Sequence, residues 1–194
     1  MQYFILKPIG DEEDVFIDAL PEGGPADWRF CEGEPLAAEF PKKAVVRFSD
    51  NFPDGRRLHD FVNNISDVLI VSKRVRRALD SIEIGNVEYL PVTILDHRGN
   101  VAAEEYFIAN VLGTEPAIDM QESDLVMSSL DDEILSIDRL VLDEGNISKG
   151  AKLFRAETLK TLFFIREDAL AALKEHGVTG IKTYEADGWD GIDA

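Results

Sequence analysis

Residues 87–111 read VEYLPVTILDHRGNVAAEEYFIANV, with an apolar, strand-like run on each side of the polar connector 96–100. β-Branched and aromatic residues on both sides of a Gly-Asn turn are typical of a β-hairpin. Pro91 lacks the N–H that a ladder needs, so its strand must be an edge or be bulged at that point. The stretch therefore predicts a hairpin near the centre of a mainly antiparallel sheet, and it indicates no chemistry of its own.

Three helices are expected to pack on this sheet, at residues 57–65, 73–83 and 167–176. The first rests on an apolar face at positions i, i+3, i+4 and i+7, formed by Leu58, Phe61, Val62 and Ile65. Ser72 is expected to cap the second helix at its N-terminus, because its hydroxyl can accept from free backbone N–H groups. Gly177 follows the third helix and is expected to be its C′ residue.

The chain has 194 residues, enough to bury a sizeable core. Strand-like runs mixed with these helices predict one α+β domain over residues 1–194. Residues 1–56 carry several Pro and Gly and are expected to be more irregular, and the polar end from 187 to 194 is expected to fray.

Composition indicates an ordinary globular protein, with 45% hydrophobic and 30% charged residues. The start of the chain shows no apolar run behind basic residues, so no signal peptide is expected. No stretch reaches the roughly 20 apolar residues that span a bilayer. A single cysteine, Cys31, excludes an internal disulfide. Together these features predict a cytoplasmic protein with no membrane partner.

Net charge is the strongest compositional feature, at −18. Residues 101–150 hold 12 acids against 2 bases, so this block alone contributes −10. Such a chain repels a phosphate backbone, and direct nucleic-acid binding is disfavoured. A basic protein partner would be attracted, although the acids could equally serve only solubility. The candidate partner-binding residues are Glu115, Asp119, Glu122, Asp124, Asp131, Asp132 and Glu133.

Residues that could carry catalysis or hold a metal do not form a convincing pattern. His59, His97 and His176 lack ligand spacing, and Cys31 stands apart from them. The sequence has neither a phosphate loop nor a GxSxG nucleophile elbow. We therefore predict no catalytic residue, no metal site and no cofactor. The basic residues of the 73–83 helix are expected to pair with nearby carboxylates: Lys73, Arg74, Arg76 and Arg77.

One segment of the chain echoes another. The pattern around Val71 and Ala78 can be laid on the pattern around Ile165 and Ala172, and in both an apolar strand runs directly into a helix and then into another apolar run. Only an Ala-Leu pair is identical, so a duplication and the common strand–helix pattern both remain open.

The central stretch resembles the core of a bacterial immunity-protein family, the eleventh class catalogued for polymorphic-toxin systems. The resemblance lies in residues 89–96 (YLPVTILD) and 106–110 (YFIAN), and it continues through 117–119 (AID), 153–155 (LFR) and 176–181 (HGVTGI). It covers most of the chain from about residue 60.

This resemblance implies a cytosolic α+β protein that binds and neutralises a cognate antibacterial toxin, with no catalytic residues to carry over. An acidic inhibitor suits a basic toxin, and nuclease toxins need basic surfaces. Trp28 or Trp189, if exposed, could add an aromatic anchor. The alternatives are a small-molecule-binding domain, with a pocket walled by Tyr89, Tyr106 and Phe107, and thirdly an uncharacterised enzyme.

Overall fold

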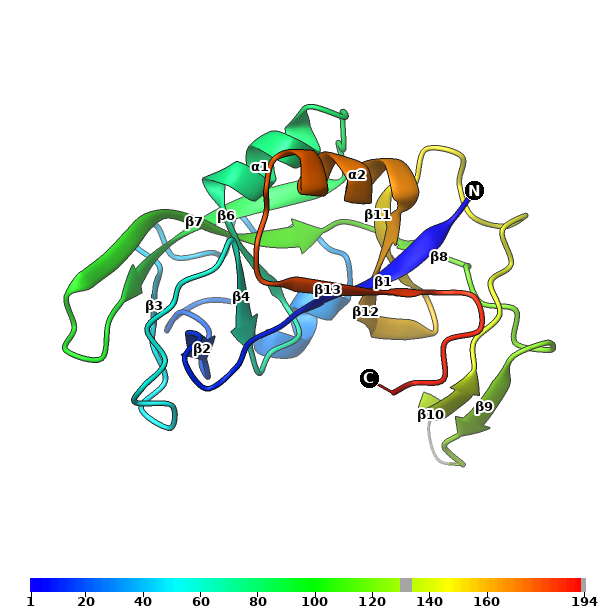
Figure 1. The fold of residues 1–194 in the computed structure, drawn as a ribbon, viewed down its shortest axis with the longest axis horizontal. Coiled ribbons are helices and arrows are strands. Elements are labelled where there is room, and N and C mark those ends of the chain that lie inside the picture. Colours follow the sequence, from blue (N-terminus) through cyan, green and yellow to red (C-terminus); the bar gives the residue numbers. More distant parts are fainter. Residues whose placement is uncertain (130–133, 193–194) are drawn as a thin grey trace.

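In the residues that it describes, 1–129 and 134–192, the computed structural model contains thirteen strands and two α-helices (Figure 1). Six strands form one sheet, in the order β2 (Phe16–Ile17), β4 (Phe61–Asn64), β5 (Leu69–Ser72), β7 (Val101–Val111), β6 (Val87–Leu95) and β3 (Val45–Arg47). Five strands form a second sheet, in the order β13 (Ile181–Glu185), β1 (Tyr3–Pro8), β12 (Leu159–Arg166), β11 (Leu153–Ala156) and β8 (Thr114–Glu115). The strands β9 (Asp124–Met127) and β10 (Ile134–Arg139) pair only with each other.

The predicted hairpin is confirmed as β6 and β7, which pair antiparallel from Val87↔Val111 onward. Both strands lie inside the six-stranded sheet. Pro91 pairs with Phe107 on one side, whereas β3 reaches only residues 93–95 on the other side. Pro91 therefore occupies a locally free edge, and its missing N–H breaks no ladder bond.

The two α-helices, α1 (Lys73–Asp80) and α2 (Glu167–Glu175), contact each other along one side of the molecule (Figure 1). Ser72 caps α1 as predicted, its Oγ accepting from the backbone N–H of Arg74 at 3.2 Å. Gly177 follows α2 with a φ of +63°, as expected for a C′ residue. None of the helices in the described residues is long and apolar enough to cross a membrane.

The predicted helix at 57–65 is wrong, because this segment forms strand β4. Phe61 packs into the core cluster that contains both helices, and its neighbour Val62 packs into the cluster on the opposite face of the sheet. A strand that is buried on both faces carries adjacent apolar residues, and over so short a run this imitates a helical face. The chain thus has two α-helices in its described part, plus a 3₁₀ turn, η1 (Asp27–Cys31).

Three hydrophobic clusters organise the interior. The first joins both helices to the inner faces of both large sheets, for example Leu79 and Leu173 with Val71 and Ile165. The second lies on the other face of the six-stranded sheet and is closed by the irregular segment 15–48. The third lies on the other face of the five-stranded sheet, where it takes in Trp189 from the segment predicted to fray. The fold is therefore α+β, with mainly antiparallel sheets.

The echo seen in the sequence corresponds to equivalent topology. In the first unit, β5 leads through α1 to the parallel strand β6, and antiparallel β7 lies between them. In the second unit, β12 leads through α2 to β13, and antiparallel β1 lies between them. The flanking strands correspond too, since β4 and β11 pair antiparallel with β5 and β12. In the first unit the central position is filled by β7, which directly follows β6 in the chain. In the second unit it is filled by the N-terminal strand β1.

Candidate functional site

The candidate acidic residues spread over the segment between β8 and β10. Glu115 Oε2 accepts from the Ser148 N–H at 2.9 Å, and Asp119 Oδ1 accepts from the Gln121 and Glu122 N–H groups. Both of these carboxylates are half-buried and stabilise turns. Asp131, Asp132 and Glu133 lie outside the described residues.

Around β9 and β10 the structure does bring acidic groups together. The Arg139 guanidinium donates to Asp124 Oδ2 at 3.1 Å and to the Glu122 carbonyl at 2.6 Å. The Glu122 and Asp138 side chains are exposed. Of the predicted set within the described residues, Glu122 and Asp124 are therefore adjacent and reachable by a partner. Glu115 and Asp119 have their oxygens engaged within the chain.

Of the two tryptophans considered as anchors, Trp28 is 66% exposed and Trp189 only 8%. Trp189 packs in the third core cluster, and its indole N–H donates to the Ile192 carbonyl. The idea that Trp189 serves as a surface anchor is therefore wrong.

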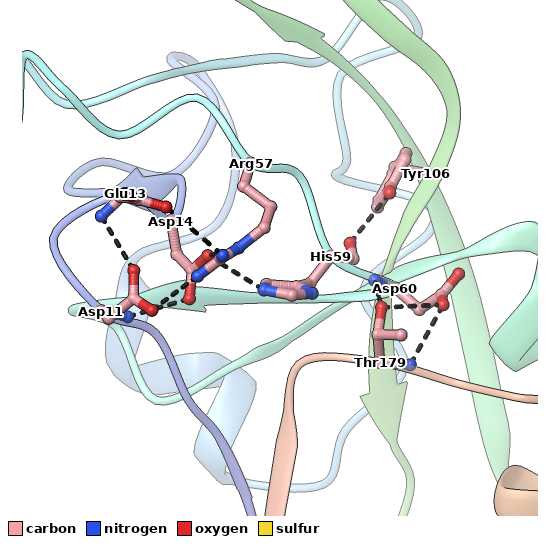
Figure 2. Close-up of polar contacts among 8 residues, drawn as sticks. All are labelled: Asp11, Glu13, Asp14, Arg57, His59, Asp60, Tyr106 and Thr179. Atoms are coloured by element: carbon pink, nitrogen blue, oxygen red, sulfur yellow. Dashed lines mark hydrogen bonds and ion pairs between the residues drawn. The ribbon is translucent and has the colours of Figure 1, made fainter.

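A polar network at the junction of the two sheets was not anticipated from the sequence (Figure 2). Buried Asp14 accepts from Arg57 Nε at 2.5 Å and lies 3.0 Å from His59 Nε2. Arg57 also contacts the carboxylates of Asp11 and Glu13. The Arg57 guanidinium thus binds three carboxylates of the acidic turn 11–14 and holds this turn against the segment that leads into β4.

Next to this network, Asp60 ties β4 to the loop between α2 and β13 (Figure 2). Its Oδ2 accepts from both the backbone N–H and the hydroxyl of Thr179 at 3.1 Å, and its Oδ1 accepts from Ser72 Oγ at 2.6 Å. Tyr106 donates its hydroxyl to the His59 carbonyl at 2.9 Å. The stretch 176–181, which carries part of the family resemblance, therefore has a structural role here: Thr179 joins the loop before β13 to Asp60, directly before β4.

The Asp14–His59 contact superficially resembles an acid–base pair. Burial raises the pKa of Asp14, but the Arg57 hydrogen bond and the Asp11 N–H outweigh it, so the net shift is downward. An anionic carboxylate already held by a guanidinium is a poor proton acceptor. The pair therefore suits fold stability rather than proton transfer.

Replacing Asp14 with asparagine is expected to destabilise the protein at pH 7 by about 1–3 kcal/mol, because the charged partner of Arg57 is lost. Asp14 has a lowered pKa in the folded state, so its contribution is present above the unfolded value of 3.8 and is lost as the pH falls through the folded pKa. Urea unfolding at pH 7 and at pH 3 measures this, and the difference from wild type should shrink at pH 3. Asp54→Asn, at an exposed neighbouring position, should match wild type at both pH values.

Three of the four basic residues of α1 that were predicted to pair with carboxylates do so. Lys73 contacts Glu105, Arg74 contacts Asp60, and Arg76 contacts Asp80. Arg76 also lies over the rings of Tyr89 and Phe107, which pack edge to face at 5.9 Å. These two aromatic residues pack against the first core cluster, whereas Tyr106 packs against the second cluster, on the other face of the six-stranded sheet.

No group of three or more His, Cys, Asp or Glu residues in the described part of the chain is arranged to hold a metal ion. A cavity of about 350 Å³ opens between the sheets, and its lining is largely polar, including Asn63, Asn64, Asp67 and Thr161. A typical small-molecule site is mainly apolar with a few polar groups. The lining of this cavity therefore differs from that of a typical small-molecule site.

Comparison with protein families gives a match over residues 9–187, to the immunity protein family Imm11. The chain belongs to this family. The match takes in both helices and every strand except β1, which lies before residue 9, so it covers most of the fold. A search of curated proteins found no match to the chain. Membership of Imm11 implies a toxin-neutralising immunity role that is exerted by binding a toxin.

Proposed function

We propose that this Imm11 protein acts in the cytoplasm without catalysis, and that it neutralises a cognate basic antibacterial toxin through an acidic surface. The family match over residues 9–187 carries the proposal. The net charge of −18, with −10 of it in residues 101–150, supports a basic partner. A nuclease fits this description, because it needs a positive surface to hold nucleic acid, and an acidic inhibitor would occupy that surface.

The family implies that the cognate toxin is encoded beside its immunity protein, so co-expression with the toxin domain from the neighbouring gene tests the proposal. The wild-type chain should restore growth of a bacterial host that expresses the toxin, and the purified pair should associate more weakly as salt is raised. Growth arrest despite full expression of the chain, together with no complex at low salt, would rule the proposal out.

Charge reversal tests the acidic surface itself. The triple variant Asp131→Lys, Asp132→Lys, Glu133→Lys is expected to slow association with the toxin by about tenfold or more at low salt, because it reverses the field that attracts a basic partner. Stopped-flow measurement at two ionic strengths gives the rate. The matched control reverses three exposed acids outside the block 101–150, Glu12, Asp50 and Asp54, and should leave most of the rate intact. Equal rates for wild type and the triple variant would remove residues 131–133 from the surface.

A further inference from the structure

The β9–β10 hairpin stands apart from the two large sheets (Figure 1). Its inner face is fixed to the body: Leu125 and Ile137 face each other across the pair and pack into the third core cluster. The segment after β13 supports it from behind. Leu140 donates its N–H to the Trp189 carbonyl, and Gly191 lies so close that a Cβ there would be 2.8 Å from the Ile137 carbonyl. The hairpin therefore projects from the two large sheets but is held in place by core packing and by the segment after β13.

Its outer face carries two exposed apolar side chains, Val126 and Leu135, among polar ones. Side chains alternate across a strand, so Val126 points away from the face that Leu125 uses. Val126 is 47% exposed and Leu135, at a bulge in β10, is 67% exposed. Met120 and Met127 are exposed close to them in the chain. A cluster of exposed apolar side chains on a braced element is typical of an interaction surface.

The surroundings of this apolar patch are negative. Residues 115–148 contain ten Asp or Glu residues and a single basic residue, Arg139. Its guanidinium is occupied by Asp124 and the Glu122 carbonyl, so it offers little charge to a partner. Exposed Glu122, Asp124 and Asp138 border the patch. An apolar centre with a charged rim is the usual anatomy of a protein–protein interface.

We propose that the outer face of the β9–β10 hairpin, Val126 and Leu135 with the flanking Glu122, Asp124 and Asp138, is the surface that binds the toxin. This deepens the proposed function and rests on it. The partner surface has an apolar centre that covers Val126 and Leu135, ringed by Lys or Arg that face the three carboxylates. Desolvated apolar anchors carry the affinity, and the carboxylates set the rate and orientation of encounter.

The test uses the full-length chain and the toxin domain encoded beside its gene, with binding measured by calorimetry. Val126→Asp combined with Leu135→Asp should weaken binding by about 100-fold or more, since both side chains lose their apolar contacts. Val101→Asp is the matched control. Val101 is 56% exposed and begins β7 at the turn of the β6–β7 hairpin, which lies far from β9 and β10 in Figure 1, so its variant should bind within about twofold of wild type.

A second arm separates charge from apolar contact. Glu122→Lys with Asp138→Lys should lower the association rate by about tenfold at low salt, and by much less at high salt. Hydrogen exchange on the wild-type complex gives an independent footprint, in which residues 124–127 and 134–139 should gain protection. This readout stands even if a variant folds poorly.

The outcomes distinguish the two proposals. If wild type binds the toxin while the Val126/Leu135 variant binds equally well, or while the hairpin gains no protection, the docking surface is wrong and the immunity function stands. If the wild-type chain neither binds nor protects, both proposals fall.

Discussion

Gly180→Ala is expected to destabilise the protein by about 3–5 kcal/mol, because backbone strain and steric overlap add. Gly180 has a φ of +83°, a conformation that L side chains rarely adopt. A Cβ there would overlap the Phe61 carbonyl and lie 2.5 Å from the His59 Cβ. The Gly180 carbonyl also accepts from the Ile9 N–H at 3.0 Å, so the loop cannot withdraw without loss. Thermal unfolding should show a midpoint lower by about 10 °C or more.

Gly188→Ala is the matched control, because Gly188 has nearly the same φ, +84°, and no atom within 4 Å of an added Cβ. The Gly188→Ala variant has the backbone strain without the steric overlap, so it should lower the free energy of unfolding by only about 1–2 kcal/mol. Equal losses in the two variants would show that the close approach of the 176–180 loop to β4 contributes nothing to stability.

The sequence was sufficient for those elements whose signal is local. The hairpin of β6 and β7 follows from its turn and its apolar runs, and the unpaired edge that Pro91 predicts is found, because β3 pairs only with residues 93–95. The caps at Ser72 and Gly177 follow from single residues, whose preferences are set by the backbone immediately around them.

The helix prediction for residues 57–65 failed because the burial of this segment depends on residues far away in the chain. Phe61 is buried in the cluster that both helices form with residues of the five-stranded sheet, and Val62 is buried in the cluster that residues 15–48 close. Periodicity within nine residues cannot carry that information, since a two-sided strand and a helix face look alike over so short a run.

The junction network was missed for the same reason. Asp14 and Arg57 are 43 positions apart, and Asp60 and Thr179 are 119 apart. Neither pair forms a recognisable motif. The only signal in the sequence was the resemblance at 176–181, which identified the stretch without its role. For the proposed partner surface, the acidic excess indicates a region of the chain, but only the structure separates turn-forming Glu115 and Asp119 from exposed Glu122.

Arg155 is the second position where a substitution should have a large effect. Its side chain is 1% exposed and lies 3.8 Å from the centre of the Phe163 ring. The guanidinium donates to the Asp67 carbonyl at 2.9 Å and to the Lys160 carbonyl. Burial lowers the pKa of Arg155 to about 10, so it is charged at neutral pH. A buried cation is held here by carbonyl dipoles and an aromatic face.

Arg155→Ala is expected to cost about 3–5 kcal/mol, because it opens a cavity beside Phe163 and leaves the Asp67 and Lys160 carbonyls without this donor. Arg155→Met should cost about 1–3 kcal/mol less than this, since methionine restores most of the volume and removes the desolvated charge. Urea unfolding of both variants measures the difference between their free energies of unfolding. Arg56→Ala, at an exposed arginine, should stay within about 0.5 kcal/mol of wild type.

The comparison of the two Arg155 variants decides what the arginine contributes. If Met is much less damaging than Ala, packing against Phe163 dominates, and the charge is tolerated rather than required. If Met is as damaging as Ala, the hydrogen bonds to the Asp67 and Lys160 carbonyls dominate. Those bonds fix the β4–β5 turn, where Asp67 has a φ of +50°, against the β11–β12 turn. In that case Arg155 joins the two units of the fold as Thr179 does, from the opposite end of β4. Wild-type stability in both variants would contradict either role.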